Sequence, residues 1–269
     1  MISILRPLSV KNLFRLFAAF SIIGVESIGF GQSSIIDQIQ TTQDSIVTIH
    51  ADISSFYKNP GDEGHKAIDP QTGKMVLVRK LTKASYNRVG AGVIIHPTGI
   101  IVTNAHVVDK AQQIKVLLHD NTEVPAKVIQ LVHNLDMVLL KIDFPTPLPA
   151  VEIANSDEIH LGEEIITVGN SSLLNQTVSG GKIIGLGVSR GQQKGGLIRN
   201  DLIQTSFNVY GGDSGGPLFN RNGLLIGLMT AKDTSADHSS FAIPANKIQQ
   251  YLLEYLRIRA PLPKYNHEL

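Results

Sequence analysis

The chain of 269 residues has no cysteine, and only 17% of its residues are charged. The lack of cysteine excludes disulfide bonds, a thiol nucleophile and thiolate metal ligands. A formal net charge of +1 argues against a nucleic-acid partner, because no basic surface is indicated. The nine histidines are scattered and show no H-E-x-x-H or similar spacing, so the sequence predicts neither a metal site nor a cofactor. We therefore expect an ordinary globular fold stabilised by packing alone.

Long hydrophobic runs are also missing. The apolar run in the N-terminal region, Leu16–Val25, is about ten residues long and too short to span a bilayer comfortably, so we expect no stable membrane insertion. Three basic residues precede this run, no acidic residue appears before Glu26, and glycines at positions 29 and 31 suit a signal peptidase. We predict that residues 1–31 are a cleaved signal peptide and that the protein is exported, periplasmic or secreted. An uncleaved anchor or an organelle transit peptide would share this composition.

Short apolar runs separated by turn signals dominate the chain from about residue 45. Runs such as SIVTIHA, GVIIHPTGIIVTN, MVLLKI, EEIITVGN and PLFNRNGLLIGLMTA are typical of β-strands. We expect the polar stretch Ser54–Asn87 to form a long surface loop. A proline-rich link, PTPLP at residues 145–149, divides the strands into two groups. Near the C-terminus, Ile248, Tyr251, Leu252 and Tyr255 fall on one face of a helix.

This organisation predicts an all-β fold in which two antiparallel β-barrels pack together and one helix closes the chain. We place barrel one at about residues 45–145, barrel two at about 150–245, the helix at about 245–258 and a C-terminal tail at 260–269. Periodicity alone does not distinguish two barrels from a large sandwich.

Three polar residues occur in segments that suit catalysis. His106, in TNAHVV, follows an apolar strand and could be both oriented and reachable, as a general base must be; taken alone, a histidine in such a place is more often structural. Asp136, in HNLDMVLLKI, either lies on the core side of a strand or simply ends the preceding turn. On the core side its carboxylate would need a hydrogen-bonding partner such as a histidine N–H.

Ser214 lies within GGDSGGPL, where four glycines surround one hydroxyl. Such glycines allow the backbone N–H groups of Gly212 and Ser214 to approach a bound oxyanion closely, although the same segment could be a plain turn. The segment also satisfies G-x-S-x-G, the nucleophile elbow of α/β-hydrolases. That fold needs its acid and histidine after the serine, and it alternates strands with helices. This chain shows no such alternation.

The three segments together resemble the catalytic blocks of chymotrypsin-like serine peptidases, most closely the HtrA (Deg) branch. EEIITVGN, QTVSGG and FAIPANKI match intervening parts of that branch, and the resemblance covers about Ser45–Leu256. It implies a trypsin-like serine protease domain over about residues 32–259, built from two six-stranded barrels with the active site between them. It also implies His106 as the base, Asp136 as the residue that orients it, Ser214 as the nucleophile, and Gly212 and Ser214 as the oxyanion hole.

The resemblance also indicates which residues would contact a substrate, although the chain differs from the family pattern at some positions. By analogy Asn208 lies at the base of the primary specificity pocket, while Thr230 and Ala231 line the substrate, and Thr230 could donate to Asp136. Because Asn208 is not a carboxylate, a trypsin-like preference for Lys or Arg is not implied. We expect small or medium aliphatic side chains in this pocket. Members of this branch are often trimers and usually carry a PDZ module, for which residues 260–269 are too few. Asp213 replaces the branch's usual asparagine.

We therefore expect a serine endopeptidase without a cofactor that hydrolyses exposed or unfolded protein segments through an acyl-enzyme. The alternative is a catalytically silent or partner-gated binding protein, such as a holdase, that keeps the protease fold.

Overall fold

The computed structural model describes residues 42–58, 65–68, 71–72, 74–78, 81–169, 177–190, 199–232 and 238–259. All of them belong to the unit Gln38–Leu269. The predicted signal peptide and the tail 260–269 lie outside the described residues. Within the described part of the chain, no helix has the length and hydropathy needed to cross a membrane.

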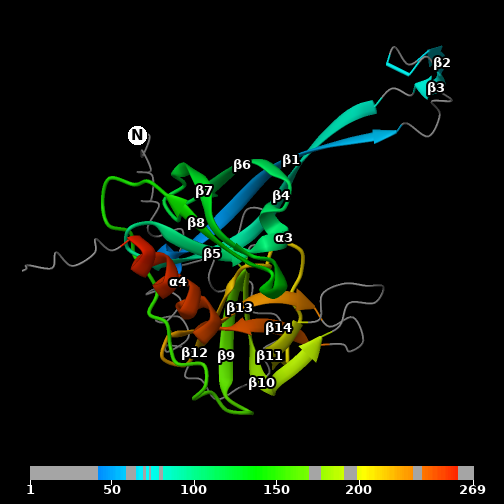
Figure 1. The fold of residues 1–269 in the computed structure, drawn as a ribbon. Coiled ribbons are helices and arrows are strands. Elements are labelled where there is room, and N and C mark those ends of the chain that lie inside the picture. Colours follow the sequence, from blue (N-terminus) through cyan, green and yellow to red (C-terminus); the bar gives the residue numbers. More distant parts are fainter. Residues whose placement is uncertain are drawn as a thin grey trace, which may run out of the picture. The chain divides into compact units, whose positions relative to one another are not determined.

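The first group of strands closes into a six-stranded antiparallel barrel (Figure 1). Its strands follow one another around the barrel in the order β1 (Ile46–Lys58), β4 (Leu81–His96), β5 (Ile100–Asn104), β8 (Met137–Ile142), β7 (Glu123–Val132) and β6 (Ala111–Leu117). A short 3-10 turn, η1 (Gln43–Ser45), precedes β1, the one-turn helix α3 (Ala105–Val108) follows β5, and η2 (His133–Leu135) leads into β8.

The second group closes into another six-stranded antiparallel barrel. Around it the order is β10 (Thr177–Arg190), β11 (Arg199–Thr205), β14 (Ser240–Pro244), β13 (Leu225–Lys232), β12 (Pro217–Asn220) and β9 (Glu164–Gly169). The helix α4 (Ala245–Arg259) follows β14 directly. Because both sheets close on themselves, the predicted pair of barrels is confirmed and the sandwich is excluded.

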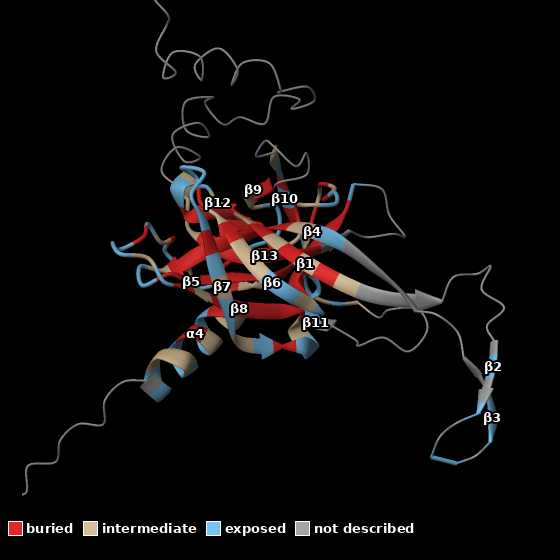
Figure 2. Ribbon diagram, turned by 90° about the horizontal axis from the view of Figure 1, so that it is seen from above, coloured by how far each residue is buried: buried red, intermediate tan, exposed pale blue. Residues whose placement is uncertain are grey.

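Each barrel has an apolar interior, and a third apolar cluster joins the two barrels to α4. Ile49, Ile101 and Leu140 lie in the interior of barrel one, and Ile165, Ile203 and Leu218 in that of barrel two. The third cluster brings together residues from β8 (Met137), β12 (Phe219), β13 (Leu228) and α4 (Ile248). Burial of side chains of this size is worth about 1.5–3 kcal/mol each, so this cluster holds the barrels and the helix in one body. The buried strands are visible in Figure 2.

The predicted apolar face of the C-terminal helix is confirmed. Ile248 and Leu252 are buried in the cluster between the barrels, and Tyr251 and Tyr255 pack against it while partly exposed.

The expectation of a loop over Ser54–Asn87 is wrong in part. Strand β1 continues to Lys58 and β4 already begins at Leu81, with Ser54 opposite Ser85 in the ladder. Between them β2 (His65–Ile68) pairs with β3 (Met75–Val78), and the side chains of Ile68 and Met75 are largely exposed. Outside the barrel such strands need no buried face, so the alternation of apolar and polar residues that reveals a strand in a sequence is missing.

Candidate active site

His106 is the second residue of α3, the single helical turn that follows β5. Its neighbours Ala105, Val107 and Val108 are buried and anchor the turn, whereas the His106 side chain remains 45% exposed. Gly90 on β4 makes this packing possible, because a Cβ at position 90 would lie 2.8 Å from both methyl groups of Val107. The helical turn is thus anchored by buried neighbours, while the imidazole itself stays accessible.

Asp136 lies just before β8, where it caps η2 in the left-handed conformation with φ of 56°. The backbone therefore follows the second of the two interpretations, in which Asp136 ends the preceding turn. Its side chain is nevertheless only 4% exposed. The tertiary fold, and not strand alternation, buries this carboxylate.

The Asp136 carboxylate accepts hydrogen bonds from His106 and Thr230. Oδ2 accepts from His106 Nδ1 at 2.7 Å and from Thr230 Oγ1 at 2.8 Å, while Oδ1 accepts from the backbone N–H of His106 at 2.9 Å. The hydrogen bond expected from Thr230 is present, and it joins barrel two to barrel one. Because an ionised carboxylate can only accept, this arrangement selects the imidazole tautomer that is protonated on Nδ1 and leaves Nε2 as an acceptor.

Ser214 lies in a tight turn that rests on barrel one. Its carbonyl accepts from the backbone N–H of Ala91 on β4 at 2.9 Å. A Cβ at the next residue, Gly215, would lie 2.3 Å from both Ala91 O and Thr103 Oγ1 and 3.2 Å from Asn104 N, and φ there is +83°. Only glycine fits so close to the segment that leads into α3. The structure therefore brings the turn of Ser214 against the elements that carry His106.

The backbone N–H groups around Ser214 differ in whether they have acceptors among the described residues. The N–H groups of Asp213, Gly215 and Gly216 donate to backbone carbonyls, but those of Gly212 and Ser214 have no acceptor among the described residues. Gly212 has φ of 102°, a conformation that favours glycine. A pair of free donors beside a serine hydroxyl is the arrangement that stabilises an oxyanion. In the described part of the chain His106 and Ser214 form no hydrogen bond with each other, and such bonds often tighten only when substrate binds.

The residues predicted to contact substrate lie in the second barrel or its loops. Asn208 is half-buried, and its Oδ1 is buried without a hydrogen-bond partner among the described residues. The N–H of the next residue, Val209, donates to Ser240 Oγ at 2.9 Å. The hydroxyl of Thr230 points to Asp136, and Ala231 follows it in β13, its side chain lying outside the description.

Sequence reasoning missed two contacts at this site. Arg88 Nη1 donates to the carbonyl oxygen of His106, and Ala91 holds Ser214 through its backbone. No sequence signal could reveal the second contact, because every non-proline residue has the same N–H. Across the described ranges, no group of three or more His, Asp or Glu side chains could hold a metal ion.

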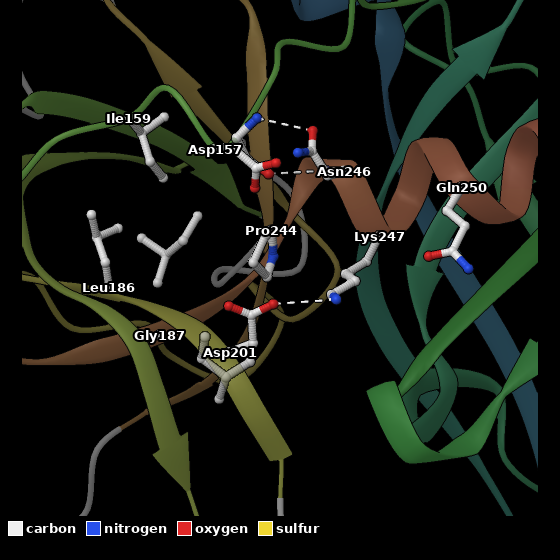
Figure 3. Close-up of a pocket in the computed structure, with 12 residues that line it drawn as sticks. Asp157, Ile159, Leu186, Gly187, Asp201, Pro244, Asn246, Lys247 and Gln250 are labelled. Carbon is white, nitrogen blue, oxygen red and sulfur yellow. Dashed lines mark hydrogen bonds and ion pairs between the residues drawn. The ribbon is translucent and has the colours of Figure 1, made fainter.

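A cavity of about 340 Å³ lies away from these residues, between β10, β11 and the start of α4 (Figure 3). Asp201 and Lys247 form an ion pair of 3.2 Å in its wall, alongside apolar side chains such as Leu186 and Ile159. None of the candidate catalytic or substrate-contacting residues lines it.

The chain is similar to proteases in several organisms. Rat "Serine protease HTR4" is 39% identical over 181 residues, 65% of this chain and 36% of the relative. "Probable periplasmic serine protease do/HhoA-like" of Haemophilus influenzae is 31% identical over 245 residues, 86% of this chain and 52% of the relative. "Periplasmic pH-dependent serine endoprotease DegQ" of Escherichia coli is 38% identical over 184 residues, 66% of this chain and 40% of the relative. The chain thus spans about half or less of the length of these relatives.

A family model described as "Trypsin-like peptidase domain" matches residues 90–228, more than half of the chain. This range includes His106, Asp136 and Ser214. The relatives named above are serine proteases of the HtrA and Deg group. Given the two barrels, the motifs and these matches, the chain belongs to the trypsin-like peptidase domain family, as a relative of the HtrA/Deg serine proteases.

Proposed function

We propose that the chain is a serine endopeptidase in which Ser214 is the nucleophile, His106 the general base and Asp136 the residue that orients the base. One observation carries this proposal. A buried carboxylate accepts from Nδ1 of an exposed imidazole, which leaves Nε2 free to take a proton, and the serine turn packs against the segment Thr103–Asn104 that leads into the helix of His106. The three residues thus have the chemistry of a hydrolase triad.

The mechanism follows from these contacts. As Ser214 Oγ attacks the scissile carbonyl carbon, His106 Nε2 takes the hydroxyl proton and then gives it to the leaving amine. The N–H groups of Gly212 and Ser214 stabilise the oxyanion, a contribution worth about 10²–10³ in turnover for one donor of this kind. Water then attacks the acyl-enzyme while His106 takes a proton from it. The proton passes to Ser214 Oγ as the carboxylic acid product leaves. Asp136 stays ionised and stabilises the imidazolium.

The substrates we propose are exposed or unfolded segments of proteins. Asn208, Thr230 and Ala231 would form the substrate-binding surface and favour small or medium aliphatic side chains. We place the protease domain at residues 32–259 after a signal peptide at 1–31, and we propose that the protein is exported. Periplasmic proteins among the relatives support that location.

The first experiment is labelling of the purified chain with a fluorophosphonate probe, followed by peptide mass spectrometry. We expect an adduct on Ser214 that is absent in Ser214→Ala and strongly reduced in His106→Ala, because only a deprotonated hydroxyl reacts readily. Hydrolysis of fluorescein-labelled casein should fall to a small residual rate in the same variants. No labelling of the wild-type chain, even with unfolded casein present, would favour the silent or partner-gated binding protein instead.

A further inference from the structure

The helix that carries His106 is too short to be stable by itself. Four residues form a single turn, and a helix of this length leaves its first N–H and last C=O groups without partners inside the helix. The orientation of the imidazole therefore depends on what holds the two ends of α3.

Asp136 holds the N-terminal end of α3. Its side chain accepts from the backbone N–H of His106 at 2.9 Å, and its carbonyl accepts from the backbone N–H of Ala105 at 3.0 Å. One residue thus satisfies two of the donors at the start of the helix, in addition to binding the imidazole ring.

Arg88 on β4 holds the C-terminal end. Its Nη1 donates to the carbonyl oxygen of His106 and lies 3.5 Å from the carbonyl oxygen of Asp109, the residue that caps α3. Arginine is well suited to this position because its guanidinium is always charged and carries donors only. A cation is also favoured where the carbonyls of a helix end.

The same stretch of β4 also holds the nucleophile. Arg88 contacts the carbonyl of His106, Gly90 packs against Val107, and the N–H of Ala91 donates to Ser214 O at 2.9 Å. Three residues within a four-residue stretch of one strand therefore make these contacts, two of them with α3 and one with the serine turn. A strand within a closed barrel is a rigid support, so this stretch can fix the separation between the two.

We propose that Arg88 is a positioning residue for His106: by holding the last carbonyls of α3, it keeps the imidazole oriented toward Ser214 for proton transfer. This inference rests on the proposed function. It predicts that the loss of Arg88 slows the chemical step and leaves substrate binding unchanged, because no contact assigned to substrate involves Arg88.

The test compares Arg88→Met with Arg221→Met, a matched change at an exposed arginine paired with Glu164 on barrel two. Active enzyme is counted by fluorophosphonate labelling, and kcat and KM are measured on fluorescein-labelled casein. We expect Arg88→Met to lower kcat about ten-fold, equivalent to about 1.4 kcal/mol, with KM within about two-fold of wild type. Arg221→Met should match wild type. Arg88→Lys should recover part of the loss, since lysine keeps the charge but not the planar geometry.

A double-mutant cycle separates positioning from a general structural role. If Arg88 acts through the imidazole, Arg88→Met should have no further effect in a His106→Ala background. Wild-type kcat in Arg88→Met, or an equal ten-fold loss in the His106→Ala background, would refute the positioning role and leave the proposed function standing. A wild-type chain that does not label at Ser214 would refute the proposed function and the positioning role together.

Discussion

Replacing Asp136 by asparagine tests the site most directly, because the side chain keeps its shape and loses one acceptor. If the amide nitrogen takes the place of Oδ2, it faces two donors, His106 Nδ1 and Thr230 Oγ1. If it takes the place of Oδ1, it faces the backbone N–H of His106. Neither orientation satisfies all three donors, since an amide has only one acceptor oxygen.

The imidazole relieves the first conflict by changing tautomer. With the proton on Nε2, the Nδ1 atom of His106 becomes an acceptor for the amide N–H of the new side chain. Nε2 then carries a proton already and cannot accept the proton of Ser214. We therefore expect kcat to fall by about 10⁴, the loss typical of this exchange in triad hydrolases. That factor corresponds to about 5.4 kcal/mol of transition-state stabilisation. KM should change little, because Asp136 is buried and does not face substrate.

The assay is hydrolysis of fluorescein-labelled casein at saturating concentration, with thermal unfolding measured in parallel to show that the variant is folded. Asp143→Asn is the matched control, because Asp143 is 82% exposed and pairs only at the surface with Lys141. It should keep wild-type activity. A folded Asp136→Asn variant within about ten-fold of wild-type kcat would show that Asp136 does not orient the base.

Three further changes probe the oxyanion turn, the core and the surface. Gly212→Ala forces a side chain onto a backbone with φ of 102°, so kcat should fall by about 10² without loss of fold by circular dichroism; unchanged kcat would argue against this turn as the oxyanion hole. Ile248→Ala should cost about 2–5 kcal/mol in urea unfolding, whereas Leu253→Ala, at an exposed site, should cost little. A hydrogen bond from Lys115, reinforced by its charge, lowers the pKa of Glu123, so the pair stabilises the fold at neutral pH and loses this effect as pH falls through the folded-state pKa. Glu123→Gln should lower the melting temperature slightly at pH 7 and not at a pH below the folded-state pKa of Glu123; an equal change at both would contradict the assignment.

Much of the architecture could be predicted from local patterns in the sequence. Strands inside a barrel alternate or are continuously apolar, and turns between them require residues such as Asn222–Gly223, so both kinds of segment are recognisable one at a time. The apolar face of α4 that includes Ile248 and Leu252 was equally predictable from the sequence, because helical spacing places these residues together whatever they pack against.

For the strands within the segment Ser54–Asn87, the prediction from the sequence failed. Strand β1 pairs with both β4 and β6 up to Ile53, and from Ser54 to Lys58 its backbone hydrogen bonds pair it with the start of β4. Such bonds are available to any residue, which is why the segment Ser54–Asn87 resembled a loop.

The candidate site shows the same division. The sequence alone suggested His106, Asp136 and Ser214 as candidates, because a histidine after an apolar strand, an acid before one and a glycine-flanked serine are distinctive residue types in distinctive surroundings. Only the tertiary structure showed that Asp136 is buried from a turn and shared with Thr230, 94 residues away, and that Arg88 and Ala91 on one strand contact both α3 and Ser214. Residue type and spacing determine what chemistry a side chain can perform, but contacts between distant segments, several of them made by the backbone, arise only when both barrels have closed.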